Sequence, residues 1–324
     1  MKNYLLTGAA GFIGSRVGEL LLDEGHAVTG IDNLNDSCDR RLKAWRLARL
    51  KTHPRFQFHR SDICDQSAIE GLFAEGRFDG VLNFAARAGV RQSLKDPHAY
   101  FDTNERGTLT LLEACRINNV KKFVLASTSS LYAVGTPQPF GEDAETNRPL
   151  SPYAASKKAA EALCHVYHHL YGLDVTIFRF FTVYGPAGRP DMSPFRFTQW
   201  ISEGRPVTIY GDGTQSRDFT FVDDIARGAI MGLRELGYEI INLGADQPSR
   251  LIDFLRMIEE AVGKKARLQF QGQHPADVQA TWADISKAAG LLGWKPECSI
   301  QQGVASLVAW YRENQSWASE VSTD

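Results

Sequence analysis

Glycines cluster at one place near the N-terminus, and this cluster limits the possible folds more than any other feature of the chain. Residues 8–14 read Gly-Ala-Ala-Gly-Phe-Ile-Gly and lie between an apolar run at 4–7 and a helical pattern that reaches about Glu24. This order predicts a strand, a tight turn and a helix. Glycines in such a turn let backbone N–H groups approach a pyrophosphate, and the start of the helix favours an anion. A purely structural turn is the alternative for the glycines taken alone.

Short apolar runs alternate with helical patterns over the first half of the chain. This alternation is typical of βαβ units and predicts a Rossmann-type, doubly wound parallel sheet of the α/β class. Further strands are predicted at 27–31, 80–84, 123–127 and 175–179, and long helices at 97–118 and 153–171.

The pattern changes after residue 179, where Gly and Pro become frequent and the elements shorter. We therefore predict a cofactor-binding domain over residues 1–179 and a smaller α/β domain that binds substrate over 180–314. Residues 315–324 are polar and are expected to fray. Whether segments cross back between the two domains is not visible in the sequence.

Asp32 directly follows the predicted strand at 27–31. A carboxylate at this position accepts hydrogen bonds from an adenosine ribose diol and repels a 2'-phosphate, which favours NAD over NADP. Alone, Asp32 is equally a turn or cap residue. Together with the upstream glycines it predicts dinucleotide binding.

Composition removes several classes of function. With a net charge of −2 the chain has no excess of positive charge to bind a polyanion, so we expect no nucleic-acid partner. The five cysteines form no CxxC pair, which indicates reduced thiols in a cytoplasmic protein. The sequence shows neither a basic leader nor an apolar run long enough to span a bilayer, so we expect no membrane association. The eight histidines lack metal-ligand spacing, and no metal is expected.

Tyr153 and Lys157 lie four residues apart at the start of a predicted helix and therefore on one face of it. A free phenol has a pKa near 10 and is a poor base at neutral pH, but a neighbouring ammonium and a positive nicotinamide ring favour the phenolate. Thr128 follows the strand at 123–127 and can hydrogen-bond the reacting oxygen. These three residues are our predicted catalytic group, although a Tyr/Lys pair at this spacing also occurs on ordinary helices.

The GxxGxxG spacing of the glycines and the Thr/Tyr/Lys set resemble the extended short-chain dehydrogenases/reductases. The resemblance implies a homodimer formed by the helices at 97–118 and 153–171. It also implies that Asp62 and Ile63 lie near the adenine and that residues 84–86 lie beneath the pyrophosphate and ribose. The complete set of residues implied to contact NAD is Gly8, Gly11, Phe12, Ile13, Gly14, Asp32, Asn33, Asp62, Ile63, Phe84, Ala85, Ala86, Asn104, Tyr153 and Lys157.

Within that family, the sequence is most similar to UDP-glucuronate 4-epimerases. Family dehydratases carry an acidic pair after the catalytic threonine, whereas Ser129 and Ser130 follow Thr128 here. Segments 88–91, 179–186, 188–192 and 217–220 carry the narrower resemblance. UDP-glucose 4-epimerases generally have asparagine where Thr182 stands. The resemblance implies conversion of UDP-glucuronate to UDP-galacturonate through a 4-keto intermediate with bound NAD.

A UDP-hexuronic acid presents a carboxylate, and Thr128, Ser129, Ser130 and Thr182 offer hydroxyl donors for charge-assisted hydrogen bonds. The serines are otherwise a hydroxyl-rich turn. The resemblance places Arg217 on the diphosphate and Asp277 on the uridine ribose. Arg91 and Arg189 are candidates for phosphate or carboxylate, or are surface arginines, and Tyr210 stacks on uracil or packs in the core. The alternatives are a UDP-glucose 4-epimerase, a UDP-glucuronate decarboxylase and, in another class, a non-catalytic NAD-binding scaffold.

Overall fold

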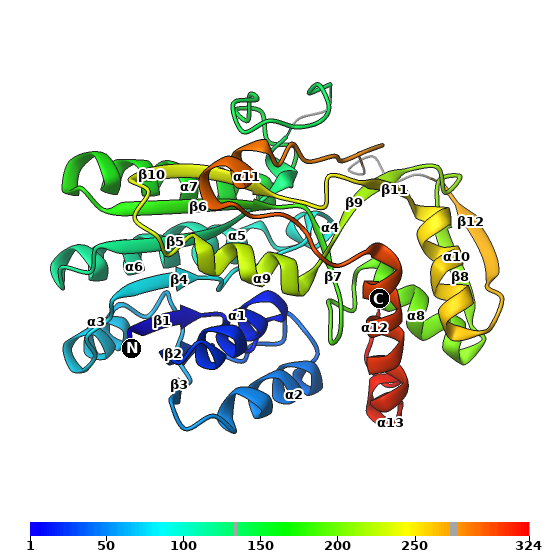
Figure 1. Cartoon of the computed structure of the whole chain (residues 1–324), viewed down its shortest axis with the longest axis horizontal. Coiled ribbons are helices and arrows are strands. Elements are labelled where there is room, and N and C mark those ends of the chain that lie inside the picture. Colours follow the sequence, from blue (N-terminus) through cyan, green and yellow to red (C-terminus); the bar gives the residue numbers. More distant parts are fainter. Residues whose placement is uncertain (133–134, 273–277, 324) are drawn as a thin grey trace.

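A seven-stranded parallel sheet forms the centre of the molecule (Figure 1). The computed structural model describes residues 1–132, 135–272 and 278–323. In sheet order the strands are β10 (Tyr238–Leu243), β6 (Asp174–Phe180), β5 (Lys122–Thr128), β4 (Gly80–Asn83), β1 (Asn3–Thr7), β2 (Ala27–Ile31) and β3 (Phe56–His59). The order reverses between β1 and β4, so this is the switch point at which such sheets bind ligands. The predicted doubly wound fold class is confirmed.

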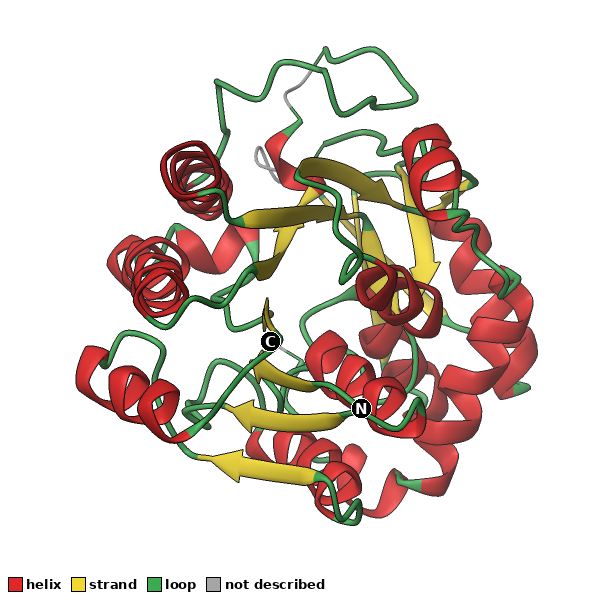
Figure 2. Ribbon diagram, turned by 60° about the vertical axis from the view of Figure 1, so that its left-hand side comes forward, coloured by secondary structure: helices red, strands yellow, loops and turns green. Residues whose placement is uncertain are grey.

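Helices cover both faces of the sheet (Figure 2). The helices on one face are α1 (Phe12–Asp23), α2 (Arg40–Lys51), α9 (Val222–Met231) and α11 (Ser286–Leu292). The helices on the other face are α3 (Gln66–Glu75), α6 (Gly107–Ile117) and α7 (Pro152–Tyr171). Each face buries its own apolar cluster, as expected when strands are covered on both sides.

The helix predicted at 97–118 is interrupted. It begins with α5 (Pro97–Phe101) and continues through a π-helical turn at Asp102–Arg106 into α6. Gly107 N–H bonds the carbonyl of Asp102, five residues back. Such turns are rare inside helices and are frequent at functional sites. This turn holds Asn104.

The sheet is not completed by residues 1–179. Strand β10 pairs with β6, and α9 and α11 cover the same face as α1, although all three elements follow residue 180. The predicted change at residue 180 therefore marks where the chain first leaves the sheet, and the chain later returns to it. The pairing between β10 and β6 joins residues more than sixty positions apart, so no local pattern reveals it.

The remaining elements form a smaller region beside the sheet, on the right in Figure 1. Its strands are β7 (Thr182–Tyr184), β9 (Ser216–Phe221) and β11 (Pro248–Arg250) in one sheet and β8 (Pro206–Tyr210) and β12 (Arg267–Gln271) in another. Its helices are α8 (Ser193–Glu203), α10 (Leu251–Val262) and α12 (Ile300–Glu313). A short α4 (Val90–Ser93) lies in the connection after β4.

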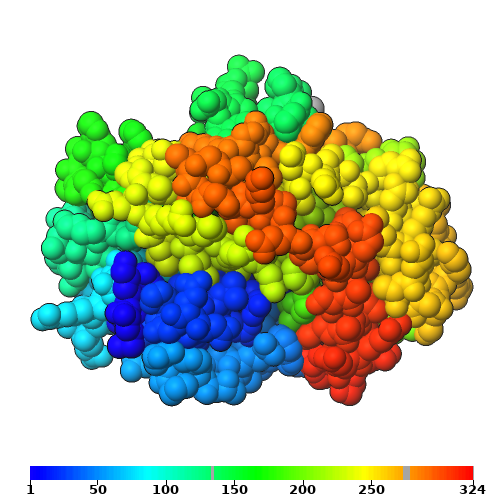
Figure 3. All heavy atoms as spheres, viewed as in Figure 1, coloured from blue at the N-terminus to red at the C-terminus, as the bar shows by residue number. Residues whose placement is uncertain are grey.

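Residues 315–323 contact the rest of the chain, and the expectation that this segment frays stays a prediction. Helix α13 (Gln315–Ala318) follows α12, and the side-chain amide of Gln199 donates hydrogen bonds to the carbonyls of Ala318, Ser319 and Val321. Figure 3 shows these last residues, in red, against the blue segment that contains α2. Because this segment is mostly polar, its sequence does not reveal that a few of its side chains are buried.

Replacing Gly8 with alanine should lower the free energy of unfolding more than the same change at Gly25. Both residues have positive φ, 66° and 88°, a conformation that costs an alanine roughly 1–2 kcal/mol. Only at Gly8 would the new Cβ also meet backbone, 2.7 Å from the nitrogen of Ala85, because nothing lies within 4 Å at Gly25. Urea unfolding of Gly8→Ala and Gly25→Ala measures the difference, and equal losses would contradict a close approach at Gly8.

Candidate active site

The glycine turn lies at the switch point, pressed against the end of β4. A Cβ on Gly14 would lie 2.4 Å from the carbonyl oxygen of Gly8, and one on Gly11 would lie 2.8 Å from the same atom. Gly11 is the N-cap of α1 and offers its first turn no side-chain acceptor. The first N–H groups of this helix are therefore available to an anion, and the tight cradle fits a pyrophosphate. Phe12 and Ile13 begin α1 directly after it.

Asp32 lies at the end of β2, next to the glycine turn, as predicted. Its carboxylate accepts hydrogen bonds from the backbone N–H of Ala10 (3.2 Å) and of Leu34 (2.8 Å). Lys43 of α2 also contacts it, with 3.3 Å between the ammonium and a carboxylate oxygen. A carboxylate at this place fits the ribose of a dinucleotide. The lysine was not foreseen.

The other predicted cofactor residues line the carboxyl ends of the neighbouring strands. Asn33 donates to Asp62 at 2.7 Å, and Ile63 follows in the same connection. On the other side of β1, the hydroxyl of Thr7 accepts hydrogen bonds from the N–H groups of Phe84 and Ala85. These bonds hold Phe84 and Ala85 beside the glycine turn, and Ala86 follows them in the chain.

Asn104 connects the loop after β4 with α7. Its side chain accepts from the N–H of Arg87 (2.8 Å) and donates to the carbonyl of Arg87 (3.0 Å) and to the hydroxyl of Ser156 (2.9 Å). Ser156 in turn donates to the carbonyl of Tyr153. Asn104 therefore fixes the first turn of α7 relative to the predicted cofactor site.

Thr128, Tyr153 and Lys157 meet at the carboxyl end of β5. The side chain of Thr128 lies close enough to the phenol of Tyr153 to lower its pKa. Lys157 is buried in the next turn of α7, and its ammonium donates to the carbonyl of Ala126 at 2.7 Å. Ser151 caps α7 by accepting from the N–H of Ala154, which fixes where the helix begins. Thr128 and the phenol of Tyr153 thus lie close together, and Lys157 is buried one turn further along α7 against β5.

Burial dominates the proton affinities of this site. It raises the pKa of Tyr153 above its ordinary value, and the hydrogen bond from Thr128 and the charge of Arg189 offset this only in part. Burial also lowers the pKa of Lys157 to about 8, although the nearby carboxylate of Glu161 opposes this shift. Among the protein groups alone, burial therefore outweighs the neighbouring charges at the phenol, and the positive nicotinamide ring is the other charge expected to favour the phenolate.

A buried ion pair that was not predicted from the sequence lies one turn after Lys157. Glu161 lies one turn after Lys157 on α7 and forms a bidentate pair with Arg179 of β6 at 3.1 and 2.8 Å. Both side chains are 2% exposed. Glu161 also accepts from Ser127 of β5. The i+4 spacing to Lys157 was the available signal, whereas the arginine is set by the packing of β6.

The predicted substrate residues come from several elements, and the structure links only some of them. Arg189 pairs with Asp191 and its charge acts on Tyr153, while Arg91 of α4 stacks on the ring of Tyr210 of β8 at 4.4 Å. The Arg91–Tyr210 contact joins the first half of the chain to the smaller region. The remaining residues are Ser129 and Ser130 in a short 3₁₀ turn, Thr182 on β7 and Arg217, which donates to the carbonyl of Ser216 on β9. Asp277 lies outside the described residues.

Arg46 is a second residue that the sequence analysis missed. It lies on α2, and its guanidinium donates to the carbonyls of Ala187 (3.0 Å), Gly188 (3.1 Å) and Ala10 (3.3 Å). One buried side chain thus joins the glycine turn to the loop that carries Arg189. No short-range pattern predicts it, because Ala187 is 141 positions away.

The described ranges offer neither a metal site nor a membrane span. No group of three or more His, Cys, Asp or Glu side chains there is arranged to hold a metal ion. No helix among the same residues is long and apolar enough to cross a membrane.

Comparisons with known proteins find relatives that span nearly the whole chain. Residues 4–244 match the NAD dependent epimerase/dehydratase family. The UDP-glucuronate 4-epimerase of Thermodesulfobacterium geofontis is 56% identical over 315 residues, which cover 97% of each chain. The crystal structure of the Bacillus cereus UDP-glucuronic acid 4-epimerase in complex with UDP-glucuronic acid and NAD is 38% identical, covers 96% of this chain and 99% of its own, and superimposes with a TM-score of 0.90. The UDP-glucose 4-epimerase of Thermotoga maritima with UDP-glucose reaches 0.88 at 30% identity, covering 97% and 99%.

Removing Arg179 should destabilise the protein strongly, because Glu161 would keep a buried charge without its partner. We expect Arg179→Met to lower the free energy of unfolding by about 3–5 kcal/mol. The matched control is Arg148→Met, which removes an ion pair with Glu145 whose side chains are 85% and 65% exposed, and it should change little. Urea unfolding compares the two variants, and similar small losses would mean that the Glu161–Arg179 pair does not stabilise the fold.

Proposed function

The chain belongs to the NAD dependent epimerase/dehydratase family, and we propose that it is a UDP-glucuronate 4-epimerase that uses bound NAD. The observation that carries the proposal is the closeness of Thr128 to the phenol of Tyr153, beside buried Lys157. These residues lie at the carboxyl ends of the parallel strands, where the glycine turn also lies. The relative with 56% identity and the Bacillus cereus complex with UDP-glucuronic acid and NAD support this substrate. The product is UDP-galacturonate.

Tyr153 acts as the base and then as the acid at one oxygen of the sugar. Its phenol takes the proton from the C4 hydroxyl, and Thr128 holds that oxygen in place by a hydrogen bond. When bound, NAD supplies a hydride acceptor at C4 and a positive charge close to the phenol. Lys157 is fixed by Ala126 and adds a further positive charge on the same helix face. The 4-keto sugar then rotates, so that the hydride held by the cofactor would return to the opposite face of C4 while Tyr153 gives the proton back to the C4 oxygen.

The diphosphate must stay bound while the ring turns. Arg217 on β9 and Arg91 on α4 are proposed to hold it, Tyr210 to stack on uracil and Asp277 to bind the uridine ribose. Arg91 and Tyr210 already contact each other across the boundary between the sheet and the smaller region. Arg189 stays close enough to Tyr153 for its charge to act on the phenol.

Hydroxyl groups on adjacent strands are proposed to bind the C6 carboxylate. Thr128 ends β5 and pairs with Phe180 of β6, and Thr182 follows Phe180 by two residues. Ser129 and Ser130 continue directly from Thr128 and are half-buried. These hydroxyls therefore lie around the same end of two paired strands, where charge-assisted hydrogen bonds can hold a carboxylate.

The enzyme must also prevent loss of the carboxylate as CO2. A 4-keto hexuronic acid is a β-keto acid and loses CO2 when its carboxylate bond aligns with the carbonyl. Hydrogen bonds that keep charge on the carboxylate and fix its torsion oppose this loss. This requirement separates the proposed epimerase from a decarboxylase acting on the same substrate.

We also propose a homodimer in the cytoplasm. Apolar side chains are exposed on α5 and α6 (Phe101, Leu109, Ile117) and on α7 (Val166, Leu170), two helical segments that pack side by side. Together they offer one apolar surface for a second copy. All five cysteines are free, which is consistent with a reducing compartment.

Tyr153→Phe should lower the turnover of UDP-glucuronate by at least about a hundredfold, because proton transfer is lost. Bound NAD should stay unchanged, since only one oxygen is removed. Tyr171→Phe, at the exposed end of the same helix, is the control and should keep wild-type turnover. Chromatography of the sugar nucleotides and of acid-released NAD measures both effects. A Tyr153→Phe variant with a tenth of the wild-type rate would exclude this tyrosine as the essential base.

The double variant Ser129→Ala with Ser130→Ala should epimerise more slowly and release more UDP-4-keto-pentose and NADH. Each lost hydrogen bond to a charged group costs about 1.5–3 kcal/mol, or roughly tenfold or more in partitioning. The ratio of UDP-galacturonate to decarboxylated product is measured, with NADH absorbance followed in parallel. An unchanged ratio would remove these serines from the carboxylate site.

A further inference from the structure

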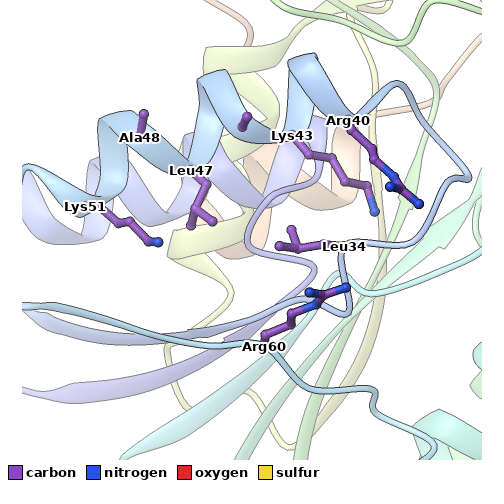
Figure 4. A pocket seen from close by; sticks show the side chains of 8 residues that line it. Leu34, Arg40, Lys43, Leu47, Ala48, Lys51 and Arg60 are labelled. Carbon is purple, nitrogen blue, oxygen red and sulfur yellow. The ribbon is translucent and has the colours of Figure 1, made fainter.

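A cavity of about 430 Å³ beside α2 belongs to the predicted cofactor site (Figure 4). Leu34 and Lys43 line it, and the backbone N–H of Leu34 and the ammonium of Lys43 both contact Asp32. Buried polar side chains that no step of the proposed mechanism uses lie elsewhere, at the carboxyl ends of β5, β6 and β10. At the centre of this group is the phenol of Tyr132, a residue that is 3% exposed.

The phenol of Tyr132 joins two strands of the central sheet. It donates to the side-chain oxygen of Asn242 on β10 at 2.7 Å and accepts from the guanidinium of Arg179 on β6 at 3.2 Å. The other end of the amide fixes the direction of the first bond, because it donates to the carbonyls of Phe140 (2.8 Å) and Asp284 (3.3 Å). The oxygen of the Asn242 amide therefore faces Tyr132, and the phenol must supply the hydrogen.

Both partners of the phenol are themselves held in place. Arg179 forms the buried ion pair with Glu161 of α7 and also donates to the carbonyl of Glu142 at 3.1 Å. The backbone N–H of Asn242 donates to the carboxylate of Glu142 at 2.8 Å. The ring of Tyr132 packs among apolar side chains. Because each polar group around the phenol has a partner, the phenol oxygen is held at one point of a connected network.

Tyr132 also ends the turn that carries the two serines of the proposed carboxylate site. Thr128 begins this turn by accepting from the N–H of Ser130 at 3.1 Å, and the N–H of Tyr132 closes it on the carbonyl of Ser129 at 3.1 Å. Thr128 is fixed by its place at the end of β5. The other end of the turn depends on Tyr132, whose phenol is bound to β6 and β10. The two serines are therefore held between a strand end and an anchored side chain.

We propose that Tyr132 is a positioning residue that acts through Ser129 and Ser130 to orient the substrate carboxylate, and that it thereby sets the ratio of epimerisation to loss of CO2. The inference rests on the proposed function, because a hexuronic acid is the sugar that brings a carboxylate to this turn. Loss of CO2 from the 4-keto intermediate breaks the bond between C5 and C6. The electron pair of that bond forms an enolate, which then takes a proton at C5. When this product leaves, the hydride from C4 stays behind as NADH.

Tyr132→Phe removes the phenol oxygen and keeps the ring. We expect the ratio of UDP-galacturonate to UDP-4-keto-pentose to fall about threefold or more, because the end of the turn loses both of its side-chain hydrogen bonds. The products formed from UDP-glucuronate are separated by chromatography, and NADH absorbance is followed in parallel. If Tyr132 only stabilises the fold, both products decrease together, and an unchanged ratio of this kind would overturn the inference.

A combined variant shows whether Tyr132 acts through the serines. Tyr132→Phe added to Ser129→Ala with Ser130→Ala should leave the ratio as it is in the serine double variant, because residues that act through one contact are not additive. A further fall, of the same size as in the wild-type background, would mean an effect that does not pass through the turn and would contradict the proposed role.

The matched control is Tyr311→Phe on α12. This phenol is also buried and donates to a side chain, the carboxylate of Glu203, at 2.7 Å, within the smaller region. The control should leave the product ratio unchanged, and an equal fall would show that the ratio follows the loss of any buried phenol. If Tyr132→Phe does not fold, Asn242→Ala removes the acceptor of the same hydrogen bond and is measured in its place, with the same expected fall.

Failure of the inference and failure of the proposed function give different results. A wild-type protein that leaves UDP-glucuronate unchanged would contradict the proposed epimerase. A wild-type protein that forms UDP-galacturonate, with a product ratio that Tyr132→Phe does not alter, would contradict only the role of Tyr132.

Discussion

Nothing larger than hydrogen fits on the Cα atoms of Gly8 and Gly14, and the rest of the site depends on this constraint. The contact between Gly8 and the backbone of Phe84 and Ala85 joins the turn after β1 to the end of β4 at the point where the strand order reverses. Because the turn is fixed there, Ala10 reaches Asp32 and the hydroxyl of Thr7 reaches the N–H groups after β4. The residues predicted to bind NAD and those predicted to be catalytic therefore lie near the carboxyl ends of the parallel strands.

Local patterns were sufficient for much of this arrangement. The turn at 8–14 and the spacing of Tyr153 and Lys157 depend on residues close in sequence, and the predicted strands agree with β1, β2, β4, β5 and β6 to within a few residues. Long-range pairing was not predictable in the same way. Strand β10 reaches the sheet from the second half of the chain, and the last residues are fixed by Gln199. Neither contact leaves a periodic signal.

Charged residues show most clearly where sequence reasoning stops. Helix α2 carries cations along its whole length and, read alone, is a solvent-facing helix. In the structure Lys43 and Arg46 are buried and bonded to Asp32 and to backbone carbonyls, whereas Arg40 and Arg49 are exposed. The partners of buried charges are chosen by the packing of distant elements, so the roles of Arg46 and of the Glu161–Arg179 pair became visible only in three dimensions.

The π-helical turn at Asp102–Arg106 fixes the number of residues that can connect α5 to α6. Each residue of an α-helix turns the chain by about 100°, so the additional residue in the turn sets the rotation of all of α6 relative to α5. Removing one residue there would give a more regular helix and would rotate Thr108 away from Asn83, with which it now shares a hydrogen bond. A sequence alignment would treat this segment as an ordinary helix that tolerates a one-residue gap. Here, a change in the number of residues also changes the orientation of α6.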